Sequence, residues 1–196
     1  MTEIGPRGQA GPDDGRDGMS DGGQNKALAH LEARGDAVPL AATLHGLIER
    51  SPLFENFSLS EIRLLSHFMQ VYFAPSGTEV IHEGDAGDFM MLLVEGRIEV
   101  LKRDRWNAQR LIAVLAPGQT VGEMSMIDGE PRFASCTAVE DSLFTVLSRE
   151  SLARIILEQP VLGAKILMEL VMMLSQRLRH TSARLMQYLD REDEHR

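Results

Sequence analysis

Short runs of strand-forming residues, separated by glycine-containing turns, fill the middle of this 196-residue chain. They follow one another from Gln70 to Ser148 as VYFAPSG, TEVIHEG, FMMLLVEG, RIEVLK, LIAVLAPG, SCTAV and SLFTVLS. The turns contain the glycines at positions 77, 84, 87, 96, 118 and 122. No helical pattern between the runs is long enough for a crossover connection, so the strands should pair antiparallel in a sandwich or barrel. We therefore predict a β-barrel over residues 70–148.

Two of these runs are apolar throughout, FMMLLV at 89–94 and LIAVL at 111–115. A continuous apolar run of this length is typical of a strand that is covered on both faces. We expect both strands to be buried between two layers.

Helical periodicity flanks the β region. Before it, Pro39 opens a segment with helical apolar spacing, and Ser58-Leu-Ser-Glu61 matches a capping box at the start of a second helix. After it, a helix should begin near Glu150, break near Pro160 and resume to near Asp190. We predict amino-terminal helices within residues 37–69 and carboxy-terminal helices within residues 149–190.

The last helix has a heptad pattern. Seven residues follow a 4-3-4-3-4-3 spacing, here called the seam: Leu167, Val171, Leu174, Leu178, Thr181, Leu185 and Tyr188. A helix packed against its own barrel would also show one such stripe. The stripe is longer than one small barrel can cover, so we favour a homodimer through this helix.

The two ends of the chain differ in composition from the centre. Residues 1–23 hold seven glycines and two prolines and few apolar residues, too few to offset the entropy of ordering. We expect a disordered glycine-rich tail over residues 1–36, with at most a weak helix from Asn25 to about Arg34, and an acidic tail over residues 191–196.

Bulk composition excludes several functions. The net charge of −9 disfavours unaided binding to nucleic acid or to anionic membranes. The single cysteine, Cys136, excludes an internal disulfide and fits a reducing cytoplasm. No histidines pair at metal-ligand spacing, and the longest apolar run, of six residues, is far too short to span a membrane. We expect a cytoplasmic protein that holds no metal.

Arg132 is the one basic residue between Leu111 and Ser148, a stretch that contains five acidic residues. It lies nine residues after Glu123 in GEMSMIDGEPRFAS, where GEMSMI should form a short helix with free backbone N–H groups. Arg132 can contact a phosphate with two donors, whereas Glu123 can accept only from a hydroxyl or from the arginine. A Glu123–Arg132 salt bridge that closes the loop explains the same two residues.

The segment GEMSMIDGEPRFAS resembles the phosphate-binding cassette of cyclic nucleotide-binding domains, in which Gly-Glu opens a short helix and Pro-Arg-x-Ala-Ser/Thr closes it. SPLFENFSLSEIRLLSHF and GTEVIHEGDAGDFMMLLVEGRIEVLK are similar to the amino-terminal helical segment and the front half of the barrel in that family. About 140 residues match, from 50 to about 190. The resemblance implies a mainly β fold: a double-stranded β-helix (jelly-roll) barrel with amino-terminal helices and a long carboxy-terminal helix, together forming one domain over residues 37–190.

The resemblance also implies the roles of particular residues. Glu123 would bind the ribose 2′-hydroxyl and Arg132 the cyclic phosphate. Backbone groups would complete the cradle at Gly122, Met124, Ser125, Phe133 and Ala134. LSQRLRHTSARL is similar to the dimer helix of the catabolite activator branch, where the hydroxyls of Thr181 and Ser182 would accept from the adenine amino group.

Two features depart from the family pattern. Phe133 follows the phosphate arginine, where small residues are usual and cGMP-selective members tend to have threonine. Its bulk disfavours cGMP and leaves the fit of a standard ligand open. The winged helix-turn-helix that follows the long helix in the activator branch is not found here, so we expect no DNA partner.

These observations favour a stand-alone cyclic nucleotide sensor, with cAMP as the regulatory ligand ahead of cGMP, that signals to an unidentified partner protein. The alternative is a degenerate member that binds no nucleotide and serves as a dimeric interaction scaffold. A transcription factor would need a basic recognition helix. An enzyme would need a nucleophile–base pair, paired carboxylates or a metal cluster, and none of these patterns occurs in the sequence.

Overall fold

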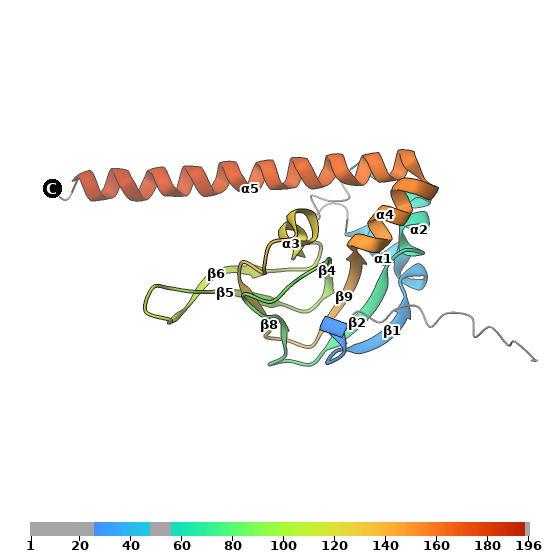
Figure 1. Ribbon diagram of the computed structural model, residues 1–196, viewed down its shortest axis with the longest axis horizontal. Coiled ribbons are helices and arrows are strands. Elements are labelled where there is room, and N and C mark those ends of the chain that lie inside the picture. The colour runs from blue at the N-terminus through green and yellow to red at the C-terminus, as the bar shows by residue number, and fades with distance from the viewer. Residues whose placement is uncertain (1–25, 48–55, 195–196) are drawn as a thin grey trace, which may run out of the picture.

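The computed structural model describes residues 26–47 and 56–194, and its centre is built from two antiparallel sheets (Figure 1). The five-stranded sheet has the order β1-β2-β9-β4-β7, and the four-stranded sheet has the order β3-β8-β5-β6. The strands are β1 (Glu32–Asp36), β2 (Gln70–Ala74), β3 (Glu79–Ile81), β4 (Phe89–Glu95), β5 (Ile98–Arg103), β6 (Gln109–Leu115), β7 (Thr120–Val121), β8 (Ser135–Ala138) and β9 (Ser142–Ser148). The predicted mainly β jelly-roll with flanking helices is confirmed.

The helices lie before, within and after the strands. They are η1 (Lys26–Leu28), η2 (Val38–Leu40), α1 (Ala41–Gly46), α2 (Leu59–Ser66), α3 (Glu123–Asp128), α4 (Arg149–Glu158) and α5 (Pro160–Glu194). The capping box at the start of α2 is confirmed, because the Ser58 hydroxyl accepts from the Glu61 amide at 3.3 Å and Glu61 Oε2 accepts from the Ser58 amide at 2.8 Å. The predicted break at Pro160 is also confirmed.

Strand β4 is buried from Phe89 to Val94, as its apolar run predicts. The same prediction is wrong for β6, where Leu111, Ile112 and Val114 are exposed. Strand β6 is the edge of its sheet, and the β5–β6 hairpin extends past the other strands, so no second layer covers it (Figure 1). A continuous apolar run therefore does not distinguish an interior strand from this exposed edge.

The amino-terminal boundary differs from the prediction. Residues expected to form a weak helix or a tail form the short helix η1 and the strand β1, whose Glu32 pairs with Phe73 of β2. All five residues of β1 are exposed, so backbone pairing rather than side-chain burial holds this strand. Its side-chain pattern consequently gave no strand signal. The rest of the predicted tail, residues 1–25, lies outside the described residues, as do 48–55 and 195–196.

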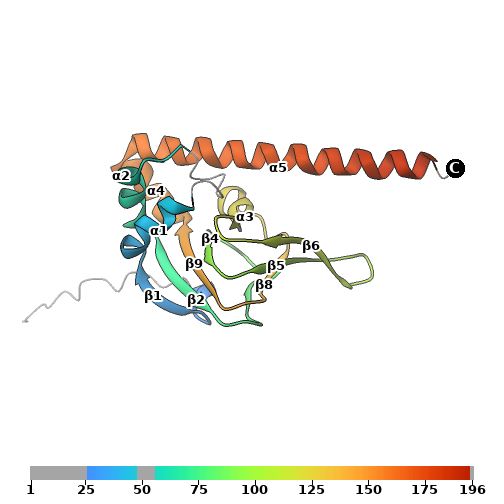
Figure 2. The ribbon, with the colours of Figure 1, turned by 180° about the vertical axis from the view of Figure 1, so that it is seen from behind.

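Helix α5 has two apolar faces. Leu162, Ile166, Leu170 and Met173 are buried in the core that the helices form with the five-stranded sheet. The predicted seam lies on another face and is exposed except for the half-buried Leu174. The interpretation that the seam packs against its own barrel is therefore wrong. The 35-residue helix is about 52 Å long and projects well past the strands (Figure 2).

Candidate functional site

A cavity of about 460 Å³ lies between α3, the adjacent strands and α5. Its volume is in the range of small-molecule sites. Eight of the nine predicted site residues line it: Gly122, Glu123, Met124, Ser125, Arg132, Phe133, Ala134 and Thr181. The ninth, Ser182, is exposed on α5 and does not line the cavity of its own chain. Helix α3 lies beneath α5 in both views (Figure 1 and Figure 2).

Gly122 begins the predicted helix α3 with a left-handed backbone, φ 85°. A Cβ atom at this position would lie 2.6 Å from Arg132 Nη1 and 3.0 Å from the Phe89 carbonyl oxygen. Arg132 Nη1 also donates to the Gly122 carbonyl at 2.8 Å. Both the backbone conformation and the lack of space therefore require glycine here.

The Arg132 side chain is buried under the loop that precedes β4. Its guanidinium lies 4.2 Å from the centre of the Phe89 ring, and a Cβ at Gly87 would fall 2.0 Å from its Nε. Burial lowers the pKa of Arg132, with Cys136 and Asp88 among the groups that oppose this shift. Nη2 is buried without a hydrogen-bond partner among the described residues. An unsatisfied buried donor is costly, so this atom is suited to an external acceptor.

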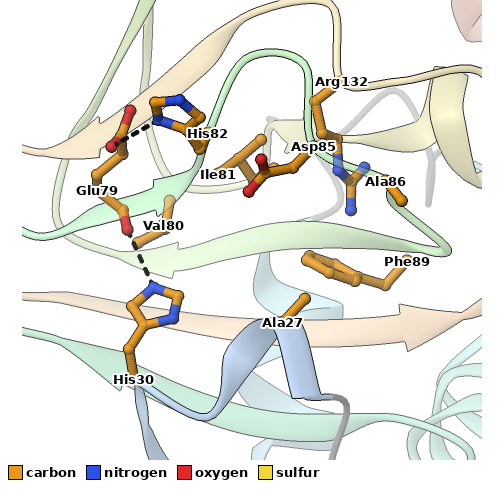
Figure 3. Close-up of a pocket in the computed structure, with 10 residues that line it drawn as sticks. All are labelled: Ala27, His30, Glu79, Val80, Ile81, His82, Asp85, Ala86, Phe89 and Arg132. Carbon is orange, nitrogen blue, oxygen red and sulfur yellow. Dashed lines mark hydrogen bonds and ion pairs between the residues drawn. The ribbon is translucent and has the colours of Figure 1, made fainter.

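A second, smaller cavity of about 150 Å³ shares Arg132 with the first (Figure 3). Arg132 points into it beside Asp85, Ala86 and Phe89, while His82 and Glu79 pair at its far side with a 3.0 Å contact (Figure 3). Asp85 also fixes the arginine backbone, since its carbonyl accepts from the Arg132 amide at 2.8 Å. The guanidinium is thus held where the two cavities meet.

Glu123 is buried and its ion-pair partner is Arg177 of α5, not Arg132. Arg177 Nη1 donates to Glu123 Oε1, and Arg177 Nη2 donates to the Thr120 carbonyl at 2.8 Å. Oε2 of Glu123 is buried without a hydrogen-bond partner in the described part of the chain. The structure therefore contradicts the interpretation that a Glu123–Arg132 salt bridge closes the loop.

Burial raises the pKa of Glu123, while the charges of Arg177 and Arg132 oppose the rise. Arg132 is alone only in the sequence, because α5 brings Arg177, His180 and Arg184 to the same cavity. Sequence reasoning missed Arg177. Its signal was helical spacing, since it lies four residues before Thr181 on the same face of the helix.

Thr181 is positioned by that same turn of helix. Its hydroxyl donates to the Arg177 carbonyl at 2.9 Å. With its proton engaged, the oxygen is left to accept a hydrogen bond. A donor on a bound ligand would therefore suit this atom better than an acceptor.

Arg149, the first residue of α4, holds the other end of α3. Its Nε donates to the Met126 carbonyl and its Nη2 to the Ser125 carbonyl, both at 2.7 Å. The Ser125 carbonyl also accepts from the Gly129 amide at 3.0 Å, so Arg149 adds further donors at the carboxy-terminal end of this short helix. Arg149 thereby ties the cassette to the carboxy-terminal helices.

Metal binding, thiol chemistry and membrane insertion would each require particular features of the described residues. No three histidine, cysteine, aspartate or glutamate side chains among them are placed to hold a metal ion. Cys136 lines the cavity, but burial raises the pKa of its thiol to about 12, which makes it unreactive. Of the helices that the structure describes, none is both long and apolar enough to cross a membrane.

The jelly-roll thus places a buried arginine and a buried carboxylate in one cavity beneath the long helix α5. Comparison with known proteins identifies the family. The family described as "Cyclic nucleotide-binding domain" matches residues 72–159. A solved cyclic nucleotide-binding domain from Methylobacillus flagellatus KT is 35% identical with a TM-score of 0.74, and the match covers 83% of this chain and 91% of that one.

The names of two curated relatives refer to cyclic AMP. The "Cyclic AMP receptor protein" of Thermus thermophilus is 31% identical over 135 residues, which cover 69% of this chain and 61% of the relative. A "CRP-like cAMP-activated global transcriptional regulator" of Mycobacterium tuberculosis is 27% identical over 71% of this chain and 60% of the relative. The chain thus spans about 60% of the length of these relatives. It belongs to the cyclic nucleotide-binding domain family.

Proposed function

We propose that this protein is a cytoplasmic sensor that binds cAMP in the larger cavity. One observation carries the proposal: Glu123 Oε2 and Arg132 Nη2, from two residues that line one cavity, are both buried without a hydrogen-bond partner among the described residues. A cyclic phosphate supplies an acceptor for the arginine, and a ribose 2′-hydroxyl supplies a donor for the carboxylate. A cyclic nucleotide carries both groups on one rigid system of two fused rings.

The choice of adenine rests on Thr181. Because the hydroxyl donates to the Arg177 carbonyl, its oxygen is available to accept from the amino group of adenine. The carbonyl oxygen of guanine at the same place would meet an acceptor. The printed names of the Thermus and Mycobacterium relatives, both of which refer to cyclic AMP, support the same ligand.

Signalling would pass through α5. This helix carries both Arg177 and Thr181, so a ligand that contacts them together with the cassette couples α3 to α5. Its exposed seam supports a homodimer, in which Ser182 could approach the cavity of the other subunit. A partner protein would read the shift of the dimer helix, since ligand binding changes the relative free energies of its positions. This is a binding role and not a catalytic one.

Calorimetric titration of the unmodified protein with cAMP, cGMP and 5′-AMP tests the proposal. We expect one cAMP per chain, weaker binding of cGMP and little binding of 5′-AMP, whose phosphate carries a second charge and is not held in a ring with the ribose. The absence of binding for all three nucleotides would contradict the sensor.

The second candidate is the nucleotide-free dimeric scaffold. The exposed seam of α5 favours it, because this surface would form a dimer whether or not a ligand binds. The same titration separates the two functions. A stable dimer that binds none of the three nucleotides would favour the scaffold.

A further inference from the structure

Phe133 is a large aromatic side chain that the fold itself does not bury. It follows Arg132, lines the larger cavity and is 56% exposed, whereas the next residue, Ala134, is buried. Exposing an aromatic ring to water is unfavourable. Its position at the cavity indicates a contact with whatever the cavity holds.

Four interactions position Phe133 and its surroundings. Lys102 Nζ donates to the Phe133 carbonyl at 2.7 Å and lies 4.5 Å from the centre of the Phe133 ring. The same ammonium donates to Glu83 Oε1 at 2.8 Å. On the preceding residue, the Arg132 carbonyl accepts from the Gly84 amide at 2.9 Å. The backbone beside Phe133 is thus bonded to β5 and to the loop after β3, and the ring lies against Lys102 before any ligand binds.

A ring held in advance loses little conformational entropy when a ligand packs on it. The ammonium of Lys102 lies over the ring, so a flat ligand group must use the remaining face or edge. Ile112 and Val114 of β6, also exposed, line the same cavity and add apolar surface for such a group. The phosphate and ribose would be bound by Arg132 and Glu123, which leaves the base of a nucleotide for this apolar part.

We propose that Phe133, positioned by Lys102, is the platform on which the base of the ligand stacks, and that it selects purine over pyrimidine cyclic nucleotides. This inference rests on the proposed function. Two fused rings offer more stacking surface than one, so a purine gains more from the platform than a pyrimidine. Lys102 acts here as a positioning residue.

The test is calorimetric titration with cAMP and cyclic CMP, both of which carry an exocyclic amino group. Phe133→Ala should weaken cAMP binding by about tenfold and cyclic CMP binding by less, so that the ratio of the two affinities shrinks. Phe133→Tyr should keep the wild-type ratio, and Phe133→Leu, apolar but not aromatic, should not. Lys102→Met should reduce the ratio in part, because the ring loses its anchor.

Trp106→Ala is the matched control. Trp106 is also an exposed aromatic with a cation over its ring, Arg105 at 3.9 Å, but it does not line the cavity. Its loss should leave both affinities unchanged. Thermal melting should show that the Phe133 variants stay folded, since the ring is not part of the core.

Three other results of these titrations would each contradict one of the claims. If the wild-type protein binds cAMP and the Phe133→Ala variant binds it as tightly or more tightly, Phe133 is not a platform for the base. The proposed function would then remain intact. An equal loss for cAMP and cyclic CMP overturns the selection of purines. Wild-type protein that binds no cyclic nucleotide overturns the proposed function and the platform with it.

Discussion

At the scale of single residues, Glu123 shows how burial and charge oppose each other at one carboxyl group. Burial is the largest influence and raises its pKa, and the charge of Arg177 is the main opposing influence. A carboxyl group with a raised pKa in the folded protein binds more protons there than in the unfolded chain. Its ionisation therefore works against folding, which is consistent with a group kept for binding.

The pH dependence of stability follows from this direction. Between the ordinary pKa of 4.5 and the raised one, the folded state binds the extra proton, so the stability contributed by Glu123 falls as pH rises. Glu123→Gln removes this effect. The melting temperature of the variant minus that of the wild type should increase from pH 4.5 to about 7.5.

Glu61→Gln provides a control of opposite sign. Hydrogen bonding to Lys165, whose Nζ lies 2.8 Å from both carboxylate oxygens, lowers the pKa of Glu61 to about 2. Its stabilisation is present above the ordinary pKa and is lost as pH falls toward 2. Glu61→Gln should therefore cost most at neutral pH. Parallel melting curves of Glu123→Gln and wild type at every pH would contradict the account of Glu123.

Thr181 gives a prediction about the choice of base. If its oxygen accepts from the adenine amino group, wild-type protein should prefer cAMP over cGMP by about tenfold, roughly 1.4 kcal/mol. Thr181→Ala should reduce this preference more than it lowers affinity, because Arg132 and Glu123 still hold the ribose phosphate. Thr181→Ser should keep the preference.

Both affinities can be measured by calorimetry, and Ser182→Ala adds information. Ser182 does not line the cavity of its own chain, so an effect of Ser182→Ala would show that the second subunit reaches the base. If Thr181→Ala leaves the preference for cAMP over cGMP unchanged, residues other than Thr181 distinguish the two purines.

At the scale of secondary-structure elements, local patterns predicted what local interactions determine. The short helix after Gly122, the capping box at Ser58 and the break at Pro160 depend on residues close in sequence, and all three are confirmed. Arg177 joins Glu123 across 54 positions, and the exposure of β6 depends on which strands cover it. The pairing of Arg177 with Glu123 and the exposure of β6 are not encoded in a local pattern, although the helical spacing from Thr181 was a signal for Arg177 itself. Sequence reasoning missed both.

Helix α5 carries a prediction of its own. The apolar residues of its seam are exposed or half-buried, while other residues of the helix pack in the core, so these apolar side chains are not buried within one chain. Two chains would bury it as a coiled coil. Leu178→Glu combined with Leu185→Glu should convert a dimer to a monomer, since four like charges would then meet in the interface.

Ala183→Glu is the control, because it adds a charge of the same sign, one per chain, at an exposed position of the helix off the seam. It should leave the mass unchanged. Analytical ultracentrifugation reports the mass directly. Wild-type protein that sediments as one chain at all concentrations would contradict the dimer.

At the scale of the whole molecule, the chain combines a rigid barrel with a site that two distant segments complete. The cassette between β7 and β8 supplies Glu123 and Arg132, and α5 supplies Arg177 and Thr181. The sequence was sufficient to predict the fold class, because the short strand runs, the turns and the flanking helical patterns indicate it, whereas the ligand-binding roles of the cassette residues stay a prediction. How α5 closes the cavity depends on tertiary packing, in which Ile166 and Leu170 are buried in the core that also contains Met126 of α3.

The most direct measurement compares cAMP titrations of wild type, Arg132→Lys and Arg132→Ala in one calorimetric series. Loss of the charge-assisted contact to phosphate should cost on the order of 2–4 kcal/mol in Arg132→Ala, and Arg132→Lys should recover only part, because an ammonium cannot make the two-pronged contact. The melting temperature of each variant without ligand is the control for folding, because Arg132→Ala also removes the hydrogen bond from Nη1 to the Gly122 carbonyl and the contact with the Phe89 ring. We predict tight wild-type binding and a large loss in Arg132→Ala. A variant without this guanidinium that binds cAMP as tightly as the wild type would contradict the account.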